Sequence, residues 1–256
     1  MIVGAVVMLA GSHAATGALA GVALGAVAGG GLVELMWCAA VGAGAGLLPD
    51  LDHPESTATR SQGPVSRAVS RGVRALSSAV WRATRTRYDD GGYRGGAGAH
   101  RHLTHTAPWC LLTGFTAGVV SVHPASGAVV LWLLVSLGLR GLGQCLTGRD
   151  REALSSWLTV SLGALLIVGV VVGVAPPHPV LLGAVVGVGA WVHVLGDWLT
   201  RQGVPLAWPL KVRGKRWWMH RSPLAFAADA DSWQERAVRW ACSVGVPALT
   251  AWAIMG

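Results

Sequence analysis

Residues 153–175 read ALSSWLTVSLGALLIVGVVVGVA and contain no Asp, Glu, Lys or Arg. A helix needs roughly 20 mostly apolar residues to cross the hydrocarbon core of a bilayer, so this run predicts a membrane span. Further apolar runs have similar lengths, although the glycines at 29–31 and Glu34 leave open whether the first two are separate spans. The candidate spans are about 14–31, 32–49, 107–122, 126–146, 153–175, 179–199 and 237–255. The sequence therefore predicts an all-α, polytopic transmembrane helical bundle with about 6–7 spans.

The composition excludes two other classes of protein. Hydrophobic residues make up 52% of the 256-residue chain and charged residues only 12%. Soluble domains carry roughly 25% charged residues. Disordered chains contain much less apolar sequence than this chain does. The four cysteines lie in apolar runs without ligand spacing, which argues against a disulfide framework or a zinc knuckle. We expect a single membrane-embedded domain over residues 1–256.

When the predicted spans cross the membrane in turn, the basic loops all lie on the same side of it. Residues 54–99 hold eight Arg and residues 201–236 hold seven Lys or Arg, whereas the loops at 121–124 and 175–179 hold neither. By the positive-inside rule the basic loops are cytoplasmic. This predicts a multi-pass protein of the bacterial cytoplasmic (inner) membrane whose partners include anionic inner-leaflet lipids. The net charge of +8 would suggest nucleic acid in a soluble protein, but here that reading ranks below lipid contact.

The basic insertion at 54–99 is itself patterned. Its apolar residues recur at helical spacing, with arginines on other faces, at Val65, Val69, Val73, Leu76 and Val80. The pattern predicts a basic amphipathic helix on the inner leaflet, with DNA binding as the less favoured alternative. A Gly-rich linker is expected to follow at 89–98. Residues 201–236 are expected to form a basic interfacial loop.

Acids and histidines from four separate segments are expected to reach one depth, at the cytoplasmic ends of the spans. They are His13, Asp50, Asp52, His53, His100, His105, His193 and Asp197. Ionisable groups at membrane depth are costly and usually functional. Carboxylate oxygen and imidazole nitrogen are ligands of zinc, manganese and iron. The convergence predicts a metal site on the cytoplasmic face.

Local spacing adds detail to this prediction. His193 and Asp197 are four residues apart on one helix and share a face. Asp50 and Asp52 alternate in a segment expected to be extended, which would put both on one side. Thr104 is expected to cap the helix that follows it. Taken singly, each feature has a plainer interpretation. His193 and Asp197 could be a buried hydrogen-bonded pair, Asp50 and Asp52 part of a turn, and the histidine-rich segment at 100–106 a solvated loop.

The same residues stand in motifs that resemble the YdjM family, described as LexA-regulated, inner-membrane-bound, metal-dependent hydrolases. The matching stretches are LLPDLDHP at 47–54, His100-Arg101, Thr104 to Thr106, His193, DWLT at 197–200 and GVPLAWP at 203–209. His13 matches a histidine near the start of the family's sequences. The resemblance implies that these stretches carry the metal site. His102 stands where the family usually has Gly, which makes it a candidate for an extra or substitute ligand.

Together these observations predict a metal-dependent hydrolase that cleaves a phosphoester at the cytoplasmic membrane surface, with a lipid headgroup as one candidate substrate. One or two divalent ions, Zn²⁺ first and Mn²⁺ or Mg²⁺ as alternatives, would activate a water molecule. Asp52 and His105 are expected to take part in catalysis, and Arg101 to hold a phosphate or stabilise negative charge. Two other classes stay open: a divalent-metal carrier or channel, and a non-catalytic membrane interaction protein stabilised by metal.

Overall fold

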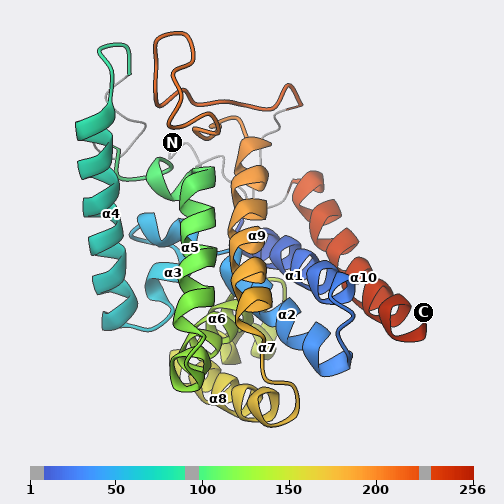
Figure 1. Cartoon of the computed structure of the whole chain (residues 1–256). Helices are drawn as coiled ribbons and strands as arrows, with labels where there is room; N and C mark the ends of the chain where they lie inside the picture. The colour runs from blue at the N-terminus through green and yellow to red at the C-terminus, as the bar shows by residue number, and fades with distance from the viewer. Residues whose placement is uncertain (1–8, 90–97, 225–231) are drawn as a thin grey trace.

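The computed structural model describes residues 9–89, 98–224 and 232–256, which form ten α-helices and two 3-10 helices (Figure 1). In chain order these are α1 (Ala10–Val27), α2 (Leu32–Ala45), η1 (Pro49–Asp52), α3 (Thr57–Arg60), α4 (Pro64–Thr84), η2 (Leu103–His105), α5 (Ala107–Val120), α6 (Pro124–Gly143), α7 (Gly148–Ala153), α8 (Trp157–Val174), α9 (Pro179–Trp198) and α10 (Trp233–Met255). The predicted all-α bundle is confirmed.

Six helices of the described chain are long and apolar enough to cross a membrane: α1, α2 with η1, α6, α8, α9 and α10. α5 is apolar but has 14 residues, which corresponds to about 21 Å at 1.5 Å per residue. A tight turn separates α1 from α2, with Gly29 in the left-handed region at φ 73°. The first two apolar runs are therefore two helices, which settles the point that the sequence left open.

α1 and α2 pack backbone to backbone because glycines line their contact. A Cβ on Gly21 would lie 2.0 Å from the carbonyl oxygen of Cys38, and a Cβ on Gly17 would lie 2.3 Å from that of Gly42. Helices in lipid associate through such close packing, because the hydrophobic effect does not drive them together there. α6, α9 and α10 pack around this pair.

We predict that Gly21→Ala lowers the thermal unfolding midpoint of the purified protein, because the added methyl group has no room beside Cys38. Overpacking of this kind costs about 1–3 kcal/mol. Gly169→Ala on α8 is the matched control, since no heavy atom lies within 4 Å of a Cβ at that position. Equal midpoints for the two variants would contradict the close packing.

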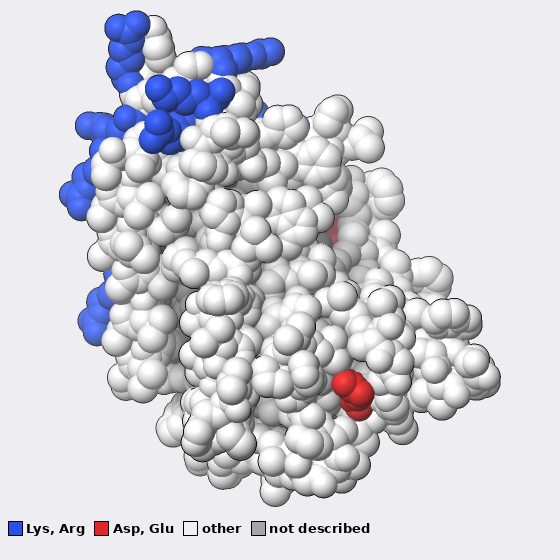
Figure 2. All heavy atoms as spheres, viewed as in Figure 1, with Lys and Arg blue, Asp and Glu red and all other residues white. Residues whose placement is uncertain are grey.

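The helix ends that carry the predicted site residues lie on one side of the bundle, and hydrogen bonds connect them to other elements. The backbone N–H of Leu9 donates to Glu235 at 3.0 Å, which ties the start of α1 to the start of α10. Arg140 near the end of α6 donates to the carbonyl oxygen of Ser61 at 3.3 Å. Lys and Arg side chains gather over one end of the molecule and along the outer side of α4 (Figure 2).

The predicted amphipathic helix is α4, and it packs against the protein with small polar side chains. Its buried residues are Ser66, Ser70, Ser77 and Trp81. Three members of the predicted apolar stripe are exposed: Val65, Val69 and Leu76. The serines form a narrow face that lets the helix lie close to its neighbours, and the apolar stripe points outward at Val65, Val69 and Leu76, whereas Val80 packs against Trp81. Contact of this stripe with the inner leaflet stays a prediction.

Residues 201–224 form a turn-rich loop that Asp89 connects to the end of α4. The carboxylate of Asp89 accepts the N–H of Trp217 at 2.9 Å and the N–H of Thr86 at 2.6 Å. Partial burial raises the pKa of Asp89, but these backbone hydrogen bonds outweigh it and hold the pKa below its usual value. Residues 90–97 of the expected Gly-rich linker and 225–231 of the expected interfacial loop lie outside the described residues.

We expect the contact between this loop and the end of α4 to weaken at acidic pH. A carboxyl group with a lowered folded-state pKa contributes stability that is complete above its unfolded value, near 3.9, and is lost as the pH falls through the folded value. Hydrogen-exchange protection of the Trp217 amide should therefore be high at about pH 6 and fall below about pH 4. Asp89→Asn should lower the protection already at about pH 6, whereas Asp150→Asn on the exposed α7 should not. Full protection in Asp89→Asn would contradict the contact.

Candidate metal centre

Four segments far apart in the chain meet in one cluster of acids and imidazoles. α1 supplies one member, η1 two, the 100–105 segment two and the last turns of α9 two: His13, Asp50, Asp52, His100, His105, His193 and Asp197. All but two of these side chains are at most 1% exposed; Asp50 is 23% exposed and His100 20%. The cluster is thus buried and reaches the surface at one edge.

His193 is oriented by the backbone at the end of α2. Its Nδ1 lies 2.7 Å from the carbonyl oxygen of Gly46, and because a carbonyl only accepts, this nitrogen carries the proton. Nε2 then faces the cluster, 3.3 Å from Nε2 of His105 and 3.7 Å from a carboxylate oxygen of Asp50. Metal-binding histidines are commonly fixed in this way by an acceptor behind the ring.

His105 is oriented from behind by Thr104 and Asp52. Oγ1 of Thr104 donates to Asp52 at 2.6 Å and lies 2.9 Å from Nδ1 of His105, from which it accepts. Nε2 of His105 consequently faces His193 and lies 3.2 Å from Oδ2 of Asp197. Burial lowers the pKa of His105, but the carboxylates of Asp52 and Asp197 outweigh it and raise the pKa to about 9. The position favours a cation, either a proton or a metal ion.

Asp50 and Asp52 point in different directions, so the prediction of an extended segment with both on one side was wrong. Pro49–Asp52 is a 3-10 helix with proline in its first turn. Successive residues of such a helix turn by about 120°, so residues two apart do not share a side. Asp50 faces His193, while Asp52 lies behind His105.

Both carboxylate oxygens of Asp52 are used by hydrogen bonds. One oxygen lies 2.7 Å from Nδ1 of His100. The other accepts the backbone N–H of Arg101 at 2.8 Å, in addition to the hydroxyl of Thr104. Asp52 was predicted as a ligand and a catalytic group, but these contacts suit a residue that orients His105.

Asp197 forms an ion pair with Arg101 through one oxygen only. Oδ1 lies 2.6 Å from Nη2 of Arg101 and 3.5 Å from Nε2 of His13. Oδ2 is buried, and its nearest polar neighbour is Nε2 of His105 at 3.2 Å, which does not form a well-aligned hydrogen bond with it. Buried polar atoms are rarely left unpartnered. A cation beside Oδ2 would satisfy it.

Two overlapping groups of ligand atoms lie within 4.8 Å of one another: His13, His193 and Asp197, and Asp50, His105 and His193. The rings of His13 and His193 are stacked with centroids 3.7 Å apart. Three imidazoles and two carboxylates form a donor set that suits Zn²⁺ or Mn²⁺. Nε2 of His193 lies 3.7 Å from both Asp50 and Asp197. Because both groups use this nitrogen, they fit one shared ion position better than two.

Besides Asp52, three candidate ligands lie outside these groups. The ring of His53 lies against that of His100 at 4.9 Å. His100 contacts the cluster through Asp52. His102 turns away: its Nδ1 lies 2.6 Å from the carbonyl oxygen of His100, and its ring lies 5.3 Å from that of Trp217. The structure therefore gives no support to His102 as a substitute ligand.

Thr106, and not Thr104, caps α5. Its Oγ1 accepts the N–H of Trp109 at 3.3 Å, so the predicted cap was wrong by two residues. The reason is that Thr104 is engaged with Asp52 and His105. Pro108, in the first turn of α5, was the available signal that the helix starts after Thr106.

Two further residues that support the site were missed. Gly46 contributes a carbonyl group, which leaves no trace in the sequence. Glu235 is 1% exposed and contacts the hydroxyl of Ser12, next to His13. Its position three residues after Ser232, which accepts its N–H at 3.3 Å, was the available signal for a helix start.

A family model described as YdjM inner membrane protein matches residues 8–256. The chain belongs to this family. The match includes all four segments of the cluster and extends through α10, which the sequence motifs did not cover. The YdjM description gives a membrane location and no activity. Comparison with curated proteins and with solved structures gave no match.

We predict that the purified protein binds one divalent ion and that His193→Ala abolishes the binding, because His193 belongs to both groups of ligand atoms. Asp197→Asn, which keeps the shape of the side chain, should weaken the affinity at least about tenfold. Plasma mass spectrometry after dialysis against Zn²⁺ measures the content. The control is His123→Ala in the loop between α5 and α6. Full metal content in His193→Ala would contradict the shared site.

Proposed function

We propose that this chain is a membrane-bound metal-dependent hydrolase that cleaves a phosphoester at the cytoplasmic surface of the membrane. The supporting observation is the pair of Nε2 atoms of His105 and His193, 3.3 Å apart and facing carboxylates in a buried cluster at the span ends. When bound there, a divalent ion, Zn²⁺ first and Mn²⁺ or Mg²⁺ as alternatives, would lower the pKa of a water molecule from 15.7 toward about 7 and make hydroxide available.

The chain's own residues then divide into two tasks. The groups that would hold the ion are His13, Asp50, His105, His193 and Asp197. Asp52 is a positioning residue, because it holds His105 through Thr104 and accepts the backbone N–H of Arg101. Carboxylates behind metal-binding histidines fix the ring and raise its basicity.

Arg101 is the residue best placed to contact a phosphate. It is 3% exposed, and its ion pair with Asp197 keeps the guanidinium beside the cluster. Its Nε has no hydrogen-bond partner, so one donor remains for a phosphate oxygen. A phosphate held there would lie next to the atoms that bind the ion.

The surroundings support an anionic substrate that arrives from the membrane surface. The cluster reaches the surface at Asp50 and His100. Basic side chains gather over one end of the molecule (Figure 2) and would attract phosphate groups and anionic lipids. A lipid headgroup is therefore one candidate for the phosphoester, and the basic surface favours a cytoplasmic orientation of the site.

The rival functions lack a supporting feature of this kind. A carrier needs polar groups along a path to both faces. Within the described ranges, the half of the bundle away from the cluster offers Glu34, His123 and His178 as ionisable side chains. A non-catalytic role would use the metal only to hold the four segments together.

Turnover of a soluble phosphoester tests the proposal. Protein in nanodiscs with Zn²⁺ should hydrolyse bis-p-nitrophenyl phosphate, and chelation should abolish the reaction. His193→Ala should be inactive, and Asp52→Asn should be about 10–100-fold slower, as found for residues that orient metal ligands. His123→Ala serves as the active control.

Three outcomes separate the functions. Hydrolysis that survives His193→Ala would refute the proposal. Metal flux into proteoliposomes without turnover would support the carrier. Bound metal with neither flux nor turnover would support the interaction protein.

A further inference from the structure

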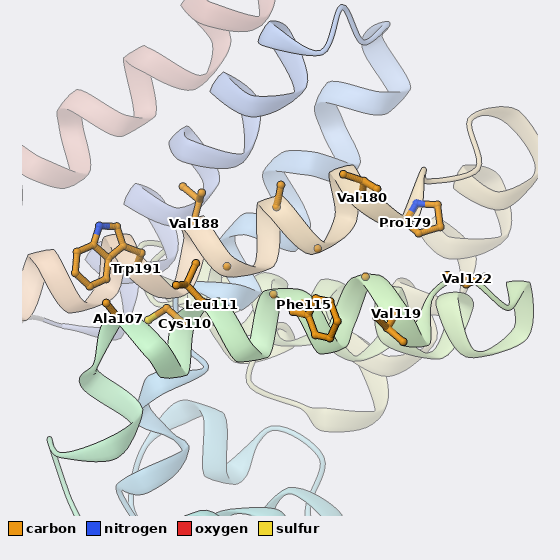
Figure 3. A pocket seen from close by; sticks show the side chains of 15 residues that line it. Ala107, Cys110, Leu111, Phe115, Val119, Val122, Pro179, Val180, Val188 and Trp191 are labelled. Atoms are coloured by element: carbon orange, nitrogen blue, oxygen red, sulfur yellow. The ribbon is translucent and has the colours of Figure 1, made fainter. Parts of the chain in front are cut away.

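An apolar groove of about 620 Å³ runs along the contact of α5 and α9 (Figure 3). This volume lies in the range of ligand pockets, roughly 300–1,000 Å³. Glycines lie along the helix contact and larger apolar side chains line the rest: Gly114, Gly118, Gly183, Gly187, Phe115 and Trp191. The groove carries almost no polar surface, so it suits a hydrocarbon chain.

The groove exists because the two helices touch through their backbones. A Cβ on Gly114 would lie 2.7 Å from the carbonyl oxygen of Gly183, and a Cβ on Gly183 would lie 2.7 Å from that of Gly114. No side chain fills the contact line. Phe115 beside it is 72% exposed, so the groove opens toward the surroundings of the bundle, which are acyl chains in a membrane.

One end of the groove lies at the helix ends that lead into the candidate metal centre. Ala107 and Trp191 lie together at that end, and Val122 lies with Pro179 at the other (Figure 3). His105 precedes Ala107 by two residues and His193 follows Trp191 by two, and the Nε2 atoms of these histidines are 3.3 Å apart. The groove and the cluster are therefore built by the same two helix ends.

Charge and length point to one occupant. The 14-residue α5 is about 21 Å long, which exceeds the roughly 15 Å hydrocarbon depth of one leaflet. His102, in the loop that leads to His105, borders a second cavity lined by Arg213 and Arg221. An apolar groove whose end lies at the helix ends of the candidate metal centre, on a chain with basic side chains in the neighbouring loop, is complementary to a phospholipid.

We infer that the groove between α5 and α9 binds an acyl chain of a membrane phospholipid and so holds the lipid's phosphoester at the cluster. The inference rests on the proposed function, since it makes this phospholipid the substrate. The acyl chain gains no hydrophobic free energy on leaving the bilayer for the groove. The groove therefore contributes orientation, which fixes the phosphate relative to the ion and Arg101.

A photoreactive lipid tests the binding site directly. In nanodiscs that contain phosphatidylglycerol with a diazirine in its acyl chain, illumination should label peptides of α5 and α9 above those of α8 and α10. Ala184 lines the groove and is exposed, so Ala184→Trp should fill the groove and reduce this labelling at least about fivefold. Ala251→Trp, at an exposed position on α10, is the matched control. Even labelling of all spans, or labelling of α5 and α9 unchanged in Ala184→Trp, would overturn the inference.

Hydrolysis separates the failure of this inference from the failure of the proposed function. In Ala184→Trp the ratio of phosphatidylglycerol turnover to bis-p-nitrophenyl phosphate turnover should fall at least about tenfold, and in Ala251→Trp it should stay at the wild-type value. An unchanged ratio in Ala184→Trp would overturn the inference while the hydrolase stands. Selective labelling of the groove without any hydrolysis would refute the hydrolase and leave an acyl-chain site.

Discussion

Asp197 stands in the last turn of α9, where its carboxylate reaches Arg101 at 2.6 Å, His105 at 3.2 Å and His13 at 3.5 Å. α1, the 100–105 segment and α9 therefore share one buried acid. Removing one partner from a buried charge pair costs about 3–5 kcal/mol, because the other charge is left uncompensated. The arrangement of the spans at this end depends on that pairing, and Asp52 completes it by holding His105 and the backbone of Arg101.

Glycines allow the helix backbones to approach closely, and this close approach lets these side chains meet. A Cβ on Gly46 would lie 2.5 Å from the carbonyl oxygen of His13, and a Cβ on Gly189 would lie 2.7 Å from the side chain of Ala45. Gly46 also gives its own carbonyl oxygen to His193. The glycine-rich composition of the spans thus has a direct link to the site: close backbones bring the ends of α1, α2 and α9, with their acids and imidazoles, within reach of one another.

The sequence predicted the spans and the segments that meet, but not the local geometry of the ligands. Long apolar runs indicate the helices, although the first begins four residues before its predicted start, and the spacing of His193 and Asp197 puts them on one face. Asp50 and Asp52 were misjudged because Pro49 permits an extended strand and a 3-10 turn alike. Thr104 was mistaken for the cap although Pro108 marks the first turn of α5; that Thr104 supports Asp52 depends on tertiary contacts. Whether these residues bind metal stays a prediction.

The nearly sealed state of the cluster has a kinetic consequence. His13, His105, His193 and Asp197 are at most 1% exposed, and the opening to the surface lies at Asp50 and His100. An ion bound behind this edge would leave only when the edge opens, so its residence time would follow the opening rate and not the strength of a competing chelator. The metal in a purified sample would then exchange slowly during dialysis or chelation, at a rate set by the opening of this edge.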